Sequence, residues 1–158
     1  MRNKLLLGLT LTTSLTAPAF AEQWYEVGTS TIEIALADKD SLQRAGNTAV
    51  MNVFHGFEYG QGEGSSIYYA KRKLEFNCNA RQVRQLQIDT FDVSHAAMQA
   101  RSFDNNWLAL ETGSAEEAAS AIACGAAFTG ESYTDPFSAS DDYWDYMYYY
   151  YGDGSSAS

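Results

Sequence analysis

The chain has 158 residues, a length typical of one domain, and it carries 20 acidic against 10 basic residues, for a net charge of −10. Binding to phosphates needs clustered lysine and arginine, so this balance argues against a nucleic-acid partner, and it argues equally against adsorption on anionic lipid. All the acidic residues follow position 21, whereas Arg2 and Lys4 precede it, so loss of the first 21 residues would leave a charge of 8 − 20 = −12.

Residues 1–21 have the pattern of a signal peptide. A positively charged start is followed by an apolar stretch at 5–15, which is too short to span a bilayer comfortably, and by the small-x-small cleavage site Ala19-Phe20-Ala21. An uncleaved membrane anchor is the alternative. We therefore expect an exported protein, periplasmic or secreted to the cell surface, with no membrane span after cleavage.

Alternation of apolar and polar residues predicts strands over most of residues 23–110. The predicted strands cover residues 23–30, 31–37, 48–59, 67–78, 81–91 and 98–103, and a turn at 104–106 leads into residues 107–110. Residues 38–42 are predicted as a turn, because Asp and Ser side chains bond the nearby backbone, and Gly46-Asn47 is a second turn signal.

The strand predicted at 67–78 is central to the arrangement. Side chains of a strand alternate between its two faces, so we expect one face to lie in the core and the other in water. The expected core residues are Tyr68, Ala70, Leu74, Phe76 and Cys78, and the expected water-facing residues are Tyr69, Lys71, Lys73, Glu75 and Asn77.

The water-facing row gives the candidate protein-binding residues Tyr69, Lys71 and Lys73, which include the chain's only concentrated positive charge. An acidic protein partner would be steered toward such a row. The alternative is a solvated or neutralised sheet face without a ligand. Arg72 points the other way and is expected to pair with a buried or half-buried carboxylate.

One helix is predicted at residues 114–124. In Ser114-Ala115-Glu116-Glu117 the Ser114 hydroxyl can accept the Glu117 N–H, while the Glu117 carboxylate reaches back to the Ser114 N–H, and Gly125 is a plausible stop. The helix consists of small residues and buries little apolar area. The expected fold class is α+β: an antiparallel sheet of about six strands with one C-terminal helix tethered by a disulfide.

The disulfide is expected between Cys78 and Cys124, the only two cysteines, because paired cysteines of exported proteins are usually oxidised. The separation is 124 − 78 = 46 residues, for which chain entropy predicts about 4 kcal/mol of stabilisation. A redox-active role is the alternative, but no Cys-x-x-Cys motif is present.

Residues 129–158 differ in composition, with six acidic residues, no Lys or Arg, and seven of the eleven tyrosines. We predict an acidic, tyrosine-rich, disordered tail that is dispensable for folding. A tyrosine-rich binding surface and a solvated tail without function both remain open.

Catalytic chemistry is not evident in the sequence. His55 and His95 are the only near-neutral bases, and neither is accompanied by a nucleophile motif or by metal-ligand spacing. We expect a protein that is not an enzyme, with no cofactor and no metal.

A set of residues in order and spacing resembles the surface-adhesin protein E family of Gram-negative exported proteins. The matching pieces are Trp24, Ile34, Asp38-x-x-Ser41-Leu42-x-Arg44-x-Gly46-Asn47, Lys73-x-x-Phe76-x-Cys78, Arg81, Arg84, Trp107, Glu117 and Cys124. The resemblance covers about residues 24–125. It implies an antiparallel sheet with a disulfide-held C-terminal helix, and an association with adhesion to host cells and extracellular-matrix proteins.

Together these features divide the chain into a signal peptide (1–21), an adhesin E-like domain (22–128) and a tail (129–158). The expected function is that of an exported, non-catalytic binding protein for host or matrix proteins. The alternative is a periplasmic structural or envelope-maintenance module with no host ligand. Expected partners are extracellular proteins or another envelope protein, and the sequence sets no oligomeric state.

Overall fold

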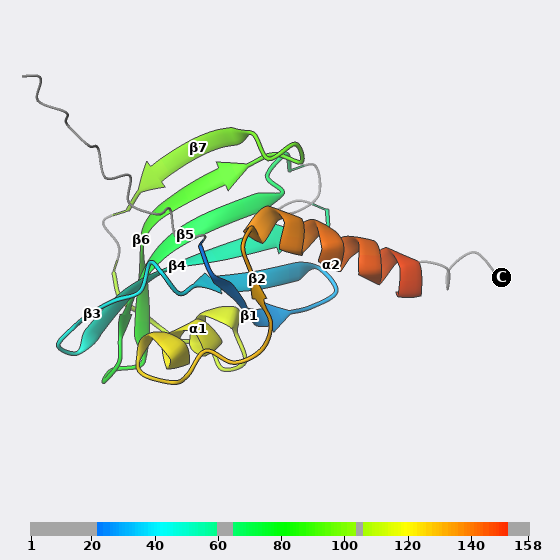
Figure 1. The fold of residues 1–158 in the computed structure, drawn as a ribbon. Coiled ribbons are helices and arrows are strands. Elements are labelled where there is room, and N and C mark those ends of the chain that lie inside the picture. The colour runs from blue at the N-terminus through cyan, green and yellow to red at the C-terminus, as the bar shows by residue number, and fades with distance from the viewer. Residues whose placement is uncertain (1–21, 60–64, 104–105, 152–158) are drawn as a thin grey trace, which may run out of the picture.

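The computed structural model describes residues 22–59, 65–103 and 106–151, so the predicted signal peptide and residues 152–158 lie outside the described part. Nine strands and two helices are present there (Figure 1). They are β1 (Trp24–Thr29), β2 (Glu33–Asp38), β3 (Gln43–Ala45), β4 (Thr48–Phe57), β5 (Tyr69–Asn77), β6 (Gln82–Phe91), β7 (Ala97–Ser102), β8 (Leu108–Ala109), α1 (Ala115–Ala123), β9 (Ser132–Tyr133) and α2 (Pro136–Tyr151). The α+β class is confirmed, but the expectation of about six strands and one helix was too low.

The strands form one antiparallel sheet in the order β7-β6-β5-β4-β2-β1-β9, with β3 paired to β4 and β8 paired to β6. Its centre is the long β4–β5–β6 meander, which follows directly from the predicted alternating segments. Gly46, at a φ of +58°, makes the expected turn between β3 and β4. Strand β3 was missed because its three residues are all exposed and show no apolar alternation.

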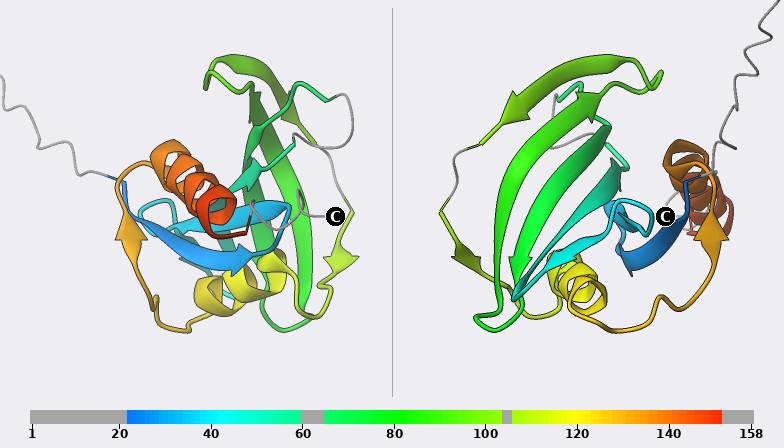
Figure 2. Two further views of the ribbon diagram at one scale, coloured as in Figure 1. Left: turned by 90° about the vertical axis from the view of Figure 1, so that its right-hand side faces the viewer. Right: turned by 60° about the vertical axis from the view of Figure 1, so that its left-hand side comes forward.

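Both faces of the central strands are buried, each under a different helix. One face packs with α1, and its cluster comprises Ala37, Ala49, Met51, Val53, Leu74, Phe76, Ala119 and Ala123. The other packs with α2, and its cluster comprises Trp24, Ile34, Leu36, Phe54, Tyr69, Ala139 and Trp144. The two clusters use alternate residues of the same strands, so they lie on opposite faces of the sheet. Figure 2 shows the sheet with its helices from two further directions.

The prediction of a disordered tail is wrong for residues 129–151. Strand β9 pairs with β1, and α2 buries Ala139 and Trp144, which are 4% and 9% exposed. Acidic residues and tyrosines hid a helical pattern, but a start signal was present in the sequence. Asp135 caps the helix by accepting the Phe137 N–H at 3.2 Å, and Pro136 follows in the first helical position, where its missing N–H costs nothing.

The second helix also changes the interpretation of β5. Leu74 and Phe76 are fully buried on the α1 face, as predicted. Tyr69 was expected to face water, yet it is 5% exposed because α2 covers the opposite face at that point. Among the described residues, neither helix combines the length and apolarity needed to cross a bilayer.

Candidate functional site

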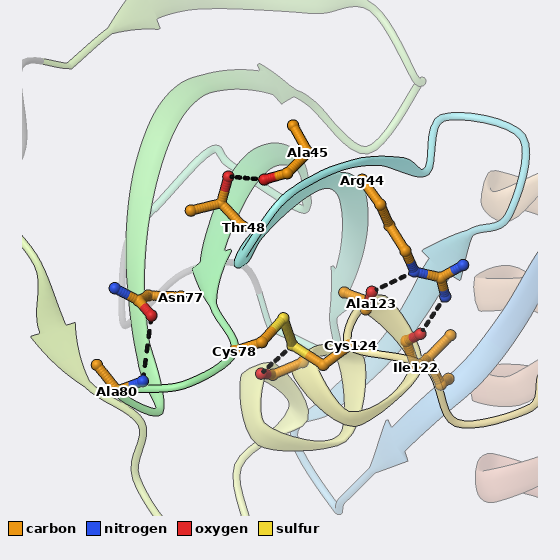
Figure 3. Close-up of a disulfide and its surroundings, with 10 residues drawn as sticks. Arg44, Ala45, Thr48, Asn77, Cys78, Ala80, Ile122, Ala123 and Cys124 are labelled. Atoms are coloured by element: carbon orange, nitrogen blue, oxygen red, sulfur yellow. Dashed lines mark hydrogen bonds between the residues drawn. A yellow bond between two sulfur atoms is a disulfide. The ribbon is translucent and has the colours of Figure 1, made fainter.

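The predicted disulfide is confirmed and lies at the C-terminal end of α1 (Figure 3). Cys78, directly after β5, is joined to Cys124 by an S–S bond of 2.07 Å. Arg44 of β3 holds the same end of α1, where its Nε donates to the Ala123 carbonyl at 2.7 Å and its second terminal nitrogen donates to the Ile122 carbonyl at 2.9 Å. The end of α1 is therefore fixed by one covalent and two charge-assisted contacts.

The start of α1 is held by capping and by ion pairs. As expected, the Ser114 hydroxyl accepts the Glu117 N–H at 3.1 Å, but the Glu117 carboxylate accepts the Gly113 N–H at 2.9 Å rather than that of Ser114. Glu117 also pairs with Arg81. Acidic side chains in this first turn suit the positive end of the helix dipole.

Arg72 pairs with Glu116, which confirms the predicted half-buried carboxylate partner, and the Arg72 Nε donates to Gln85 Oε1 at 2.6 Å. Burial by itself would raise the pKa of Glu116, but the Arg72 guanidinium, with smaller contributions from a backbone N–H and His55, holds it below its usual value. The carboxylate therefore stays charged in its partly buried position.

The three candidate protein-binding residues share one face of β5 but differ in access. The Tyr69 hydroxyl donates to Asp141 Oδ1 of α2 at 2.6 Å, and its ring lies 5.2 Å from that of Phe137. Burial, together with the Asp141 carboxylate, raises the pKa of Tyr69 well above its usual range. Tyr69 thus anchors α2, and its assignment as an accessible binding residue is wrong.

Lys71 and Lys73 remain accessible on that face. Lys71 is half-buried and Lys73 is exposed, and within the described ranges no ion pair involves either side chain. Asp89 of β6 lies directly across from Lys71, while Gln87 lies across from Lys73. Glu75 follows Lys73 on the same face of β5 and is paired with Arg84, so carboxylates lie near both lysines, and the role of the two lysines in binding stays a prediction.

A row of exposed tyrosines occupies the end of α2 that extends past the sheet in Figure 1. The exposed members are Tyr146, Tyr148, Tyr149, Tyr150 and Tyr151, with exposed fractions between 52% and 77%. The helix therefore has two parts: an N-terminal half packed on the sheet and a C-terminal half that presents aromatic side chains.

Sequence reasoning missed a cleft of about 580 Å³ between the N-terminal end of α1 and the open part of the sheet. Its apolar lining comes from Ala35, Phe57, Ala70 and Ile88, and its ionisable or amide lining comes from Glu33, His55, Arg72, Gln85 and Glu116. These residues come from five separate elements, so no local motif could reveal the cleft. The one available signal was a histidine within the apolar run that became β4.

His55 is the most unusual residue of the cleft. It is 3% exposed, and its Nδ1 contacts the Glu33 carboxylate. Its other ring nitrogen, Nε2, is buried without a hydrogen-bond partner in the part of the chain that the structure describes. His95, the second histidine, lies apart from the cleft and contacts Asp141 at 3.1 Å through its Nε2. In the described ranges, no group of three or more His, Cys, Asp or Glu side chains is arranged to hold a metal.

Comparison with known proteins gives one family match. The model of the family described as Surface-adhesin protein E matches residues 24–125, more than half of the chain, and the chain belongs to this family. The match runs from β1 through α1 to the disulfide and ends before β9 and α2. A search of curated proteins found no match. Family membership and the disulfide together indicate an extracellular or envelope protein.

Proposed function

We propose that this member of the surface-adhesin protein E family is an exported, non-catalytic binding protein whose partners are extracellular proteins, including host or matrix proteins. The family match over residues 24–125 carries the proposal, because it covers the central strands, α1 and both cysteines. The disulfide supports export, since such bonds persist in oxidising compartments.

Within the family-matched region, the accessible lysines of β5 are the better-placed surface for such a partner. Lys71 and Lys73 lie two residues apart on one face, in a chain whose net charge is −10. Local positive charge on an acidic protein directs an acidic partner to one orientation. The tyrosines of α2 lie outside the matched region and offer amphipathic contact area at low entropic cost. They would add a contact outside the family-matched region.

The second candidate is a periplasmic structural or envelope-maintenance module without a host ligand. One observation favours it: both cysteines of the sequence are joined in the disulfide, so neither carries a lipid that would hold the protein at an outer surface. This candidate predicts an envelope protein as the partner.

Two measurements separate the candidates. The first is the accessibility of the protein to added protease in intact cells, with a known periplasmic protein as the control. The second is binding of the purified protein, without its predicted signal peptide, to immobilised laminin, vitronectin and fibronectin. Surface access with saturable binding supports the adhesin function, whereas full protection together with no binding overturns it in favour of the envelope module.

A further inference from the structure

We propose that the cleft beside α1 binds a small amphipathic molecule, an apolar body carrying a protonated amine or a hydroxyl that donates a hydrogen bond to His55. This inference does not rest on the proposed adhesin function, because the cleft lies on the α1 face of the sheet, whereas Lys71 and Lys73 project from the opposite face. It goes beyond protein binding to a second kind of ligand.

The tautomer that a neutral His55 ring adopts beside Glu33 indicates the polarity of the ligand atom. Its Nδ1 contacts the Glu33 carboxylate, which accepts hydrogen bonds, so Nδ1 carries the hydrogen. In the neutral ring, Nε2 then carries a lone pair and can only accept. A buried polar atom left without a partner is unfavourable, so a hydrogen-bond donor from a ligand would be stabilised there.

The charged residues that line the cleft favour a cationic ligand over an anionic one. Two carboxylates, Glu33 and Glu116, line it together with the single guanidinium of Arg72. Arg72 is already engaged by Glu116 and Gln85, so it is poorly placed to hold a ligand anion. The positive end of α1 is likewise offset by the acidic residues of its first turn.

The shape and lining of the cleft suit an apolar body. Ala35 and Ala70 leave room above the strands, and Phe57 and Ile88 add apolar wall. Its volume of about 580 Å³ lies within the range of small-molecule sites, roughly 300–1,000 Å³. Small-molecule sites combine apolar wall with convergent polar groups that orient the ligand, and the cleft offers both.

The test uses two probes with the same aromatic body and opposite charge, 2-phenylethylamine and 3-phenylpropionate. Each is titrated into the purified protein while the His55 ring nitrogens and the backbone amides are followed by ¹⁵N NMR. The amine is expected to shift Nε2 and the amides near Ala70 and Ser114 saturably, with millimolar affinity. The carboxylate is expected to bind at least fivefold more weakly.

Two variants test whether the amine binds in the cleft. His55→Phe removes the acceptor at similar volume, and Ala70→Val fills the floor while leaving His55 and Glu33 in place; each should weaken amine binding at least fivefold. Lys39→Ala, at an exposed position outside the cleft lining, is the control and should leave the affinity unchanged. Equal responses to both probes, shifts outside the cleft, or no saturable shift in the wild-type protein would overturn the proposal. The wild-type titration decides the matter even if a variant fails to fold.

Discussion

Gly56 of β4 and Ser140 of α2 set how closely the second helix approaches the sheet. A Cβ added at Gly56 would lie 2.9 Å from the Ser140 Cβ, a separation that real side chains essentially never show. Ser140 itself is fully buried. The absence of a side chain on one strand residue therefore lets α2 lie directly on the backbone of β4 and bury Trp144 nearby.

Gly56→Ala is expected to displace α2 and destabilise the protein by about 1–3 kcal/mol, the usual cost of overpacking. Urea unfolding measures the free-energy change. Ser140→Gly in the Gly56→Ala background restores space and should recover part of the loss, whereas Ser140→Gly alone should be mildly destabilising. Additive effects of the two changes would mean that the two residues do not contact each other.

Truncation after Gly130 is expected to lower the melting temperature by many degrees or to cause aggregation. The change removes β9 and α2 and leaves a continuous apolar face exposed, formed by Trp24, Ile34, Leu36, Phe54 and Tyr69. Thermal unfolding followed by circular dichroism tests this, with truncation after Tyr151 as the control that keeps the helix. A melting temperature within one or two degrees of the full-length value would show that neither β9 nor α2 contributes to the stability of the fold.

Much of the fold could be predicted from local pattern. The alternation in residues 48–59, 67–78 and 81–91 located β4, β5 and β6 to within a few residues, and the capping residues located α1. The short strands β3 and β9 have too few residues for a period to show. Helix α2 was missed because more weight was given to the acidic, tyrosine-rich composition than to two helical signals. These signals are the Asp135-Pro136 start and the apolar stripe that includes Phe137 and Trp144.

The site was harder to predict because it depends on contacts between distant segments. The sequence placed Lys71 and Lys73 on one face and Arg72 on the other, and the structure agrees. It could not show that α2 covers Tyr69, since that depends on a helix 72 residues away. The pairing of Glu33 with His55 is likewise a property of register between β2 and β4 rather than of any motif.

Loss of the disulfide is expected to lower stability by about 2–5 kcal/mol, the usual range for a native disulfide. The double change Cys78→Ser with Cys124→Ser avoids a free thiol, and urea unfolding gives the free energy. Arg44 should keep α1 docked in this variant, because its two bonds to the Ile122 and Ala123 carbonyls do not depend on the sulfurs. Adding Arg44→Ala should therefore release α1, seen as rapid amide exchange across residues 115–123. Continued slow exchange there would show that neither tether is needed.

The pair of Arg72 with Glu116 predicts a defined pH dependence. The pKa of Glu116 is lower in the folded state than its ordinary 4.5, so the pair contributes fully above about pH 4.5 and is lost as the pH falls through the folded-state value. Glu116→Gln should therefore cost on the order of 1 kcal/mol at pH 7 and less at pH 3, because protonation of the carboxylate weakens the pair as the pH falls. Urea unfolding of both proteins at the two pH values measures this. A difference of equal size at pH 3 would mean that charge on Glu116 contributes nothing.

The accessible lysines of β5 give the last prediction. Lys71→Glu together with Lys73→Glu should slow association with an acidic protein ligand by about tenfold at low salt, with the difference shrinking as salt screens the charges. The fold should persist, although Asp89 opposite Lys71 adds a like-charge neighbour worth a few tenths of a kcal/mol. Lys39→Glu with Arg101→Glu, both on exposed positions elsewhere, makes the same change in net charge and serves as the control. Surface plasmon resonance at two salt concentrations gives the rates. If the β5 variant and the control associate equally fast at low salt, the lysines are not the site, and the exposed tyrosines of α2 become the surface to change next.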